Sequence, residues 1–185
     1  KVSTNTFGSK LFVEGPLLGN GKSSFVFSGK TSYLDKSSEI LYKEPILYFD
    51  EKGLPYSYTD LYGKFSLHGN NGSKINIFGF NFQDKVDYEG ISELNWASKG
   101  IGSEFILIPG NSPVLIEGNF AYSFYEIALD EEASNLRESR IDGFDMGFDF
   151  TSFQPKGKIK YGFDIHGFST DFTTYNSVNS KVDQK

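Results

Sequence analysis

The feature that most constrains this chain is the strict alternation of apolar and polar side chains in its C-terminal third. Between Ile141 and Phe153, an apolar residue occupies nearly every second position, with glycine, aspartate or threonine between. Because successive side chains of a β-strand point to opposite sides, this pattern predicts a strand with one apolar and one polar face. The apolar set is Phe144, Met146, Phe148 and Phe150; the polar set is Gly143, Asp145, Gly147, Asp149 and Thr151.

The same alternation returns elsewhere in the chain. The next segment sets Ile159, Tyr161, Phe163 and Ile165 against Lys158, Lys160, Gly162, Asp164 and His166. Shorter alternating runs begin near Phe25 and Leu61, and no segment gives a clear helical pattern. With the turns between them, these runs predict a single all-β segment of about eight strands. The expected hairpins span approximately residues 9–34, 56–88, 101–130 and 139–174.

Short and long connections are expected to alternate between the strands. Tight turns rich in Gly, Asn and Pro are predicted at residues 19–22, 69–72, 110–113 and 154–157. Longer polar connections are predicted over residues 35–57, 88–102 and 130–140. Outer-membrane β-barrels sort their loops in this way, and their strands exceed the five or six residues usual in globular proteins. The predicted fold is therefore an antiparallel up-and-down transmembrane β-barrel.

Aromatic residues are expected to gather toward the long-loop ends of the strands. Such residues form girdles at the membrane–water interfaces of barrels. The expected girdle comprises Tyr33, Tyr56, Tyr58, Tyr88, Tyr122, Phe124, Tyr125, Phe172 and Tyr175.

Composition excludes several classes of function. The 185-residue chain contains no cysteine, which removes disulfides, thiolate metal sites and cysteine nucleophiles. Its formal net charge of -6 argues against a nucleic-acid partner, because phosphate binding requires clustered Lys and Arg. No apolar stretch is long enough for a membrane helix, and no signal peptide is expected at the start.

Several short motifs resemble the early barrel strands of TonB-dependent receptors from Bacteroidetes-type bacteria. The first is Leu11-Phe12-Val13-Glu14-Gly15-Pro16-Leu17, followed by Lys22-Ser23-Ser24-Phe25-Val26-Phe27-Ser28-Gly29-Lys30-Thr31-Ser32-Tyr33-Leu34. The later ones are Tyr58-Thr59-Asp60-Leu61-Tyr62-Gly63-Lys64, Ile77-Phe78-Gly79-Phe80-Asn81-Phe82-Gln83-Asp84 and Leu94-Asn95-Trp96-Ala97. Their order and spacing carry the resemblance, which covers roughly residues 8–172.

The resemblance implies a place in the bacterial outer membrane and a role in nutrient transport. Such receptors have a barrel of about 22 strands closed by an N-terminal plug. Implied partners are outer-membrane lipid, the remaining strands and plug, the TonB complex and a surface lipoprotein. This sequence departs from the pattern in lacking a plug, a TonB box and a terminal aromatic residue. It is therefore expected to be an arc of a larger barrel.

Candidate functional residues follow from the expected faces. The polar face supplies lumen candidates for binding: Lys64, Asp145, Asp149, Asp164 and His166. Trp96, placed in the second long loop, is a candidate either for stacking on a ligand or for anchoring at the membrane interface. The lipid-facing candidates are Phe144, Phe148, Ile159, Phe163 and Ile165.

No catalytic residue, metal site or cofactor is expected. Asp145 and Asp149 lie on one strand face about 13 Å apart, too far for a retaining glycosidase pair. His68 and His166 have no convergent third ligand in the sequence pattern. The Gly19–Ser23 segment lacks the glycine spacing and following helix of a phosphate loop.

Three functions remain open at this stage. In the first, implied by the resemblance, the chain is expected to be part of a TonB-dependent receptor for nutrient uptake, forming barrel wall and extracellular loops. Alternatively, it is a complete eight-stranded outer-membrane barrel with a structural or adhesive role, or a soluble β-barrel that binds a ligand.

Overall fold

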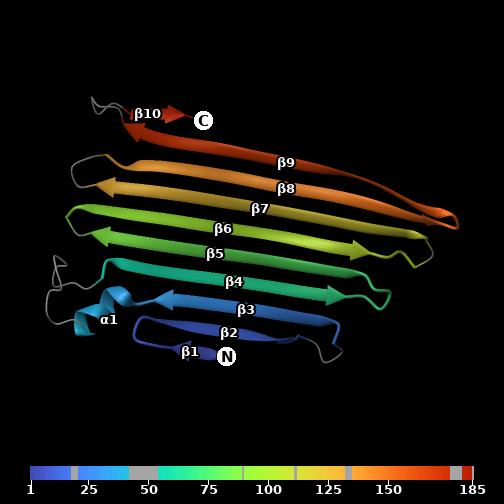
Figure 1. The fold of residues 1–185 in the computed structure, drawn as a ribbon, viewed down its shortest axis with the longest axis horizontal. Coiled ribbons are helices and arrows are strands. Elements are labelled where there is room, and N and C mark those ends of the chain that lie inside the picture. Colours follow the sequence, from blue (N-terminus) through green and yellow to red (C-terminus); the bar gives the residue numbers. More distant parts are fainter. Residues whose placement is uncertain are drawn as a thin grey trace.

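The computed structural model describes residues 1–17, 21–41, 54–88, 90–110, 112–131, 135–175 and 181–184. Ten strands form one sheet in chain order from β1 to β10, and every neighbouring pair is antiparallel (Figure 1). The strands are β1 (Val2–Thr4), β2 (Gly8–Pro16), β3 (Ser23–Ser32), β4 (Tyr56–His68), β5 (Lys74–Tyr88), β6 (Ser92–Leu107), β7 (Val114–Glu131), β8 (Arg137–Gln154), β9 (Gly157–Tyr175) and β10 (Lys181–Gln184). The expected all-β, antiparallel, up-and-down architecture is thus confirmed.

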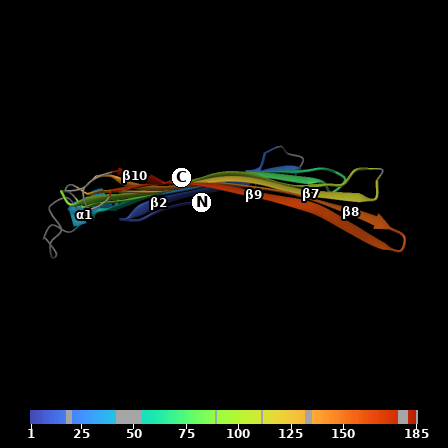
Figure 2. The same ribbon diagram turned by 90° about the horizontal axis from the view of Figure 1, so that it is seen from above.

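The sheet is a single open layer. Seen from above, the strands form one thin, gently curved layer (Figure 2). β1 and β10 are the two edges of the sheet and do not pair with each other. No hydrophobic side chain of the described residues is buried. A sandwich would bury apolar side chains between its layers, and a barrel with a packed interior would bury them inside. The described residues form neither arrangement.

The two ends of the sheet differ. At one end, called here the turn end, lie the hairpins β2–β3, β4–β5, β6–β7 and β8–β9 (right in Figure 1). At the other, called the helix end, lie the hairpins β5–β6 and β7–β8 and the helix α1 (Leu34–Leu41). Gly21 and Gly72 at the turn end, and Gly90 between β5 and β6, adopt positive φ angles of 68°, 86° and 70°, a conformation that glycine adopts without strain.

Glycines opposite aromatic residues allow close cross-strand packing. Phe78 and Phe80 of β5 lie directly opposite Gly102 and Gly100 of β6. A Cβ atom at either glycine would come within 2.6 Å of the facing phenyl ring. Each ring therefore occupies the space that the glycine leaves empty.

Several expectations about strand number and loops are wrong. Ten strands are present rather than about eight, because β1 and β10 pair along the edges of β2 and β9. The connection expected over 88–102 is absent, since β6 begins at Ser92 and pairs with β5 along its length. β7 likewise runs to Glu131 and β8 starts at Arg137. The polar residues in these segments belong to strands that have a solvated face, and not to loops. The connections are therefore shorter than expected, and short and long loops do not alternate as predicted.

One helix was not anticipated. α1 lies inside the connection expected over residues 35–57, of which residues 42–53 lie outside the described part of the chain. The hydroxyl of Ser38 donates to the Leu34 carbonyl and accepts from the Leu54 amide at 2.6 Å. These bonds tie α1 to the start of the segment that leads into β4. No helix among the described residues is long and apolar enough to cross a membrane.

Candidate functional site

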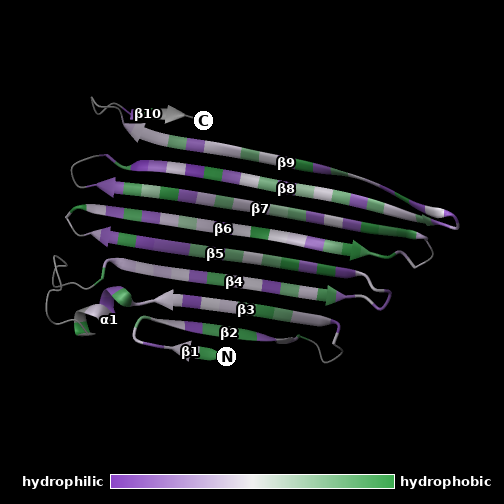
Figure 3. Cartoon of the chain, viewed as in Figure 1, coloured by the Kyte–Doolittle hydropathy of each residue, from purple (hydrophilic) through white to green (hydrophobic). Residues whose placement is uncertain are grey.

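Each face of the sheet collects the alternate residues of every long strand. We call face 1 the side that carries Phe148 and Phe163, which are directly opposite each other on β8 and β9. Face 2 is the side that carries Asp145 and His166, also directly opposite each other. Because partners in an antiparallel pair point to the same side, the register assigns every strand residue to one face. Figure 3 shows apolar and polar residues alternating along the strands.

On face 2, a transverse row of polar residues crosses the sheet near the turn end. Consecutive partners in register are Ser24, Ser66, Asn76, Glu104, Asn119, Gly147 and Asp164, from β3 to β9. Together with its neighbours Lys64, Glu117, Asp145, Asp149, Lys160 and His166 on the same face, this row is called the polar strip.

The first half of the polar strip is a hydrogen-bonded chain. The Ser66 hydroxyl donates to Asn76 Oδ1 at 2.7 Å, and Asn76 Nδ2 donates to Glu104 Oε1 at 2.6 Å. Asn76 is only 2% exposed and Ser66 only 8%. A buried amide costs free energy unless it is hydrogen-bonded, and these bonds satisfy it. They also fix three strands relative to one another.

The second half of the polar strip is charged. The Asn119 amide donates to Asp145, and the imidazole of His166 lies within salt-bridge reach of the same carboxylate. Lys160 Nζ lies 3.1 Å from Asp149 and 4.0 Å from Glu117. These side chains are 38–69% exposed. They form an accessible surface of mixed charge rather than a dry ionic core.

A hollow of about 350 Å³ lies along the polar strip at the turn end. Its polar lining comes from β5 to β8: Lys74, Asn76, Glu104, Glu117, Asn119 and Asp149. Glycine at position 147 contributes no side chain to this surface, and the side-chain oxygens of Asn119 and Asp164 lie over it instead. The hollow is thus suited to hydrated, polar contents.

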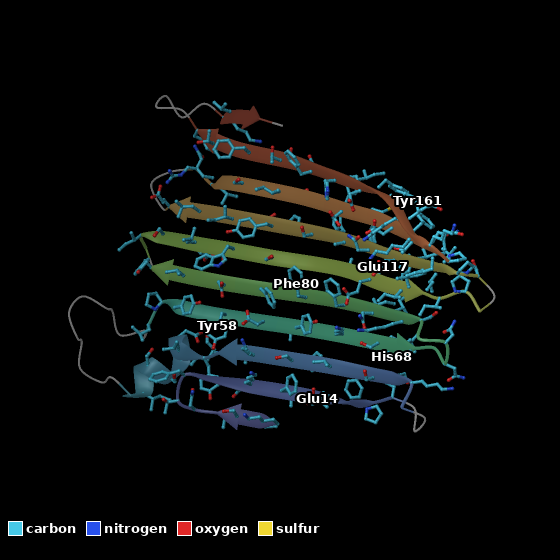
Figure 4. All side chains as sticks on the ribbon, turned by 45° about the vertical axis from the view of Figure 1, so that its right-hand side comes forward. Glu14, Tyr58, His68, Phe80, Glu117 and Tyr161 are labelled. Carbon is cyan, nitrogen blue, oxygen red and sulfur yellow. The ribbon has the colours of Figure 1, made fainter. Side chains whose placement is uncertain are left out.

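Toward the helix end, face 2 changes character. Tyr58, Asp84, Trp96, Ile127, Ser139 and Phe172 are consecutive partners in register from β4 to β9. The next row toward the helix end contains Tyr56, Val86, Leu94, Leu129 and Arg137, from β4 to β8, and Thr174 follows Phe172 on the same face of β9. We call these two rows the aromatic strip. Figure 4 shows Tyr58 near the helix end, with Glu117 and His68 toward the turn end.

The aromatic strip presents rings and a shallow hollow. The rings of Tyr56 and Tyr58 lie 5.9 Å apart, and the Tyr56 hydroxyl donates to Asp84 at 3.5 Å. Burial, followed by the proximity of Asp84, raises the pKa of Tyr56 above its usual value, so this tyrosine stays neutral at physiological pH. A hollow of about 320 Å³ is lined by residues that include Leu94, Ile127 and Phe172. This zone can stack against planar or apolar groups.

The six predicted binding residues all lie on face 2, but not together. Lys64, Asp145, Asp149, Asp164 and His166 belong to the polar strip. Trp96 lies in the aromatic strip, and its expected position in a long loop is wrong. It is a strand residue of β6 paired with Asp84 and Ile127. The five predicted lipid-facing residues all lie on face 1: Phe144, Phe148, Ile159, Phe163 and Ile165.

The expected aromatic girdle is divided between the two faces. Tyr122, Phe124 and Tyr175 lie on face 1. Tyr56, Tyr58, Tyr88, Tyr125 and Phe172 lie on face 2, whereas Tyr33 follows the end of β3 and donates a hydrogen bond to the Asn5 carbonyl. The alternation of apolar and polar residues changes phase within some strands, so position along the chain does not show on which face an aromatic residue lies. The expected girdle therefore combines residues of both faces.

Sequence reasoning missed the chain of Ser66, Asn76 and Glu104 and the contribution of Glu117 and Asn119. It placed Lys160 on the polar face but did not name it as a candidate site residue. It also missed the aromatic strip as a unit. The signal was a phase change in the alternation. Along β7, the aromatic residues up to Phe124 occupy even positions, whereas Tyr125, Ile127 and Leu129 occupy odd positions.

On face 1 near the helix end, an ion-pair cluster joins β5 and β6. Lys85 Nζ lies 2.7 Å from Glu93 and 3.1 Å from Asp87, and Asn95 donates to Glu93 at 2.6 Å. The hydrogen bond from Lys85, and then that from Asn95, lowers the pKa of the Glu93 carboxyl. Both partners are 39% exposed, which marks a hydrated surface rather than an active site.

The arrangement offers contact surfaces more than reactive groups. Among the described residues, no three His, Asp or Glu side chains are grouped to hold a metal ion. Comparison with protein-family models, curated proteins and solved structures finds no match. The resemblance to TonB-dependent receptors therefore rests on the sequence motifs alone.

Proposed function

We propose that this chain forms part of the wall of a transmembrane β-barrel in the bacterial outer membrane. In this proposal it belongs to a TonB-dependent receptor that takes up nutrients, has no catalytic role and requires no cofactor. Face 1 meets lipid, and face 2 lines the lumen. Its partners are outer-membrane lipid, further strands and a plug, with the TonB complex and a surface lipoprotein implied by the resemblance.

The observation that carries the proposal is a single layer with large apolar side chains exposed on it. On face 1, Ile159 is 59% exposed, Tyr161 61% and Phe163 50%. In water, contiguous exposed apolar surface of this kind is unfavourable, whereas in a bilayer it is solvated by acyl chains. At the same height, face 2 of β7 to β9 carries Glu117, Asp149 and Lys160, as expected for a lumen filled with water.

The open edges favour an arc of a larger barrel over a complete small one. The outer edge of β9 pairs with β10 only from Phe172 to Tyr175. In lipid, unpaired backbone groups along the rest of that edge would cost several kcal/mol each, roughly, so further strands must cover them. The alternative of a soluble ligand-binding barrel requires a dry interior, which no described residue forms.

Disulfide trapping tests the proposal, because the natural chain has no cysteine. The matched positive control is Glu14→Cys with Val26→Cys, which are partners on β2 and β3. The test pairs combine Glu14→Cys with Gly162→Cys, Asp164→Cys or His166→Cys on β9. In outer membranes, we expect only the control to cross-link within one chain.

Each result has a definite meaning. Cross-linking of β2 to β9 within one chain would replace the arc with a self-contained small barrel. Failure of the chain to sediment with outer membranes, with the control disulfide formed in the soluble fraction, would refute the membrane role. A structure in nanodiscs would then show which strands adjoin the two edges.

A further inference from the structure

We infer that lipid covers only the turn-end half of face 1, up to a boundary that follows one row of partnered residues, and that the helix-end half stands in water. This inference rests on the proposed membrane role and specifies its interaction surface. The occupant is the acyl-chain region of the bilayer.

Two rows on face 1, separated by one intervening row, define the boundary. The row on the turn-end side contains no polar side chain except the Tyr122 hydroxyl: Val13, Phe27, Gly63, Gly79, Ile101, Tyr122, Phe144 and Gly167, from β2 to β9. Four positions further along each strand, beyond one row of mixed character, the row is almost entirely polar: Ser9, Thr31, Thr59, Gln83, Ala97, Glu126, Arg140 and Asp171. The change occurs at the same level in eight strands.

The side chains between these rows suit a headgroup layer. Phe124 lies at this level, with the Arg140 guanidinium 4.7 Å and Lys99 Nζ 5.9 Å from its ring centroid. The Tyr122 hydroxyl donates to Asp142 at 2.8 Å, and Arg140 makes two hydrogen bonds to the same carboxylate. Aromatic rings with polar tips, beside basic side chains with apolar stems, are typical of membrane–water interfaces.

The height of the apolar zone matches a bilayer. On β7 it extends from Val114 to Phe124, and the ten residue-to-residue steps between them span about 33 Å at the usual rise. A tilt of about 45° reduces this to about 23 Å, close to the apolar band of about 25 Å in outer-membrane barrels. If the bilayer covered the whole strand, Glu126 and Asp130 would lie in hydrocarbon.

Face 2 changes in the opposite sense at the same height. Beside the lipid-covered half, face 2 carries the polar strip, with Phe78 and Leu115 among its neighbours, and beside the half that stands in water it carries the aromatic strip. A uniformly amphipathic sheet would keep one apolar face throughout. The exchange of faces therefore marks a change of solvent on face 1, from lipid to water.

Single-tryptophan scanning with brominated phospholipids tests this boundary. In a Trp96→Phe background, Phe120→Trp and Ala128→Trp place the fluorophore on face 1 of β7, on either side of the boundary. Ala121→Trp is the matched control on face 2 at the height of Phe120. In vesicles with brominated acyl chains, Phe120→Trp should lose most of its fluorescence. Ala128→Trp and Ala121→Trp should retain nearly all of theirs.

A second pair guards against misfolding of the first. Ile101→Trp and Ala97→Trp occupy the two bounding rows on β6. Equal quenching of both members of either folded pair would overturn the boundary while leaving the membrane role intact. Quenching of Ala121→Trp alone would show that lipid meets face 2 and not face 1. No quenching in any variant, with the chain absent from the vesicles, would refute the membrane role itself.

Discussion

Replacement of Phe148 by arginine is the most direct perturbation of face 1. Phe148 lies within the apolar zone of β8, its ring centroid 5.8 Å from that of Phe105 and 5.5 Å from that of Phe163. Phe148→Ala removes both ring contacts, each contributing about 0.5–1.5 kcal/mol. Phe148→Arg loses the same contacts and also places a charge near the bilayer midplane, which costs a further ~2–4 kcal/mol.

The difference between the two variants isolates the lipid contribution. We expect Phe148→Arg to be less stable than Phe148→Ala by about 2–4 kcal/mol, a factor of roughly 30 to 1,000 in the folded-to-unfolded ratio. The control is Glu138→Arg on the same strand and face, beyond the boundary, where the change should be at most about 1 kcal/mol. Urea unfolding in vesicles, followed by the fluorescence of Trp96, measures all three.

Two results would refute the reasoning. If Phe148→Arg and Phe148→Ala unfold at the same urea concentration, the arginine does not enter hydrocarbon, and face 1 is not a lipid surface. If Glu138→Arg is as damaging as Phe148→Arg, the bilayer extends over the full strand and the boundary is misplaced.

Three further predictions concern packing, burial and charge. Gly102→Leu should destabilise the sheet by about 1–3 kcal/mol, because a Cβ atom at this position meets the ring of Phe78. Gly63→Ala should cause no such loss, because nothing lies within 4 Å of a Cβ atom there. Adding Phe78→Ala to Gly102→Leu should recover part of the lost stability, measured as the urea midpoint of unfolding. Asn76→Ala should lower the free energy of unfolding by about 1–3 kcal/mol, because Ser66 and Glu104 lose their hydrogen-bond partner. A loss no larger than that caused by Asn81→Ala would contradict the role of this buried hydrogen-bonded chain. Because Glu93 has a lowered pKa when folded, its pairing with Lys85 should stabilise the β5–β6 hairpin above about pH 4.5, the ordinary pKa of a glutamate, and the stabilisation should be lost as pH falls through the lowered value. Hydrogen exchange across this range should show that loss in the natural chain and not in Glu93→Gln.

Loop positions and strand ends were poorly predicted because turn residues also occur inside strands with solvated faces. Residues 88–102 contain Gly90, Asn95 and Gly100, which suggest a loop, yet all but the first few belong to β6. The pairing with β5 and β7 supplies the backbone hydrogen bonds that make this segment a strand. That information lies in distant parts of the chain, not in the segment itself.

The sequence by itself determined the antiparallel order of the eight long strands and the two faces at the turn end. Those properties depend on side chains two positions apart, as in Phe144 to Phe150, and on turns such as Gln154–Gly157. Only the tertiary structure decided which residues meet across strands: the chain of Ser66, Asn76 and Glu104, the aromatic strip and the straight boundary on face 1. Each depends on the register between strands, where a shift of one residue exchanges the faces. Period-two alternation specifies the two faces of each strand but not the register between strands. That register is set by the hydrogen-bonded ladder and by the packing of aromatic rings against glycines.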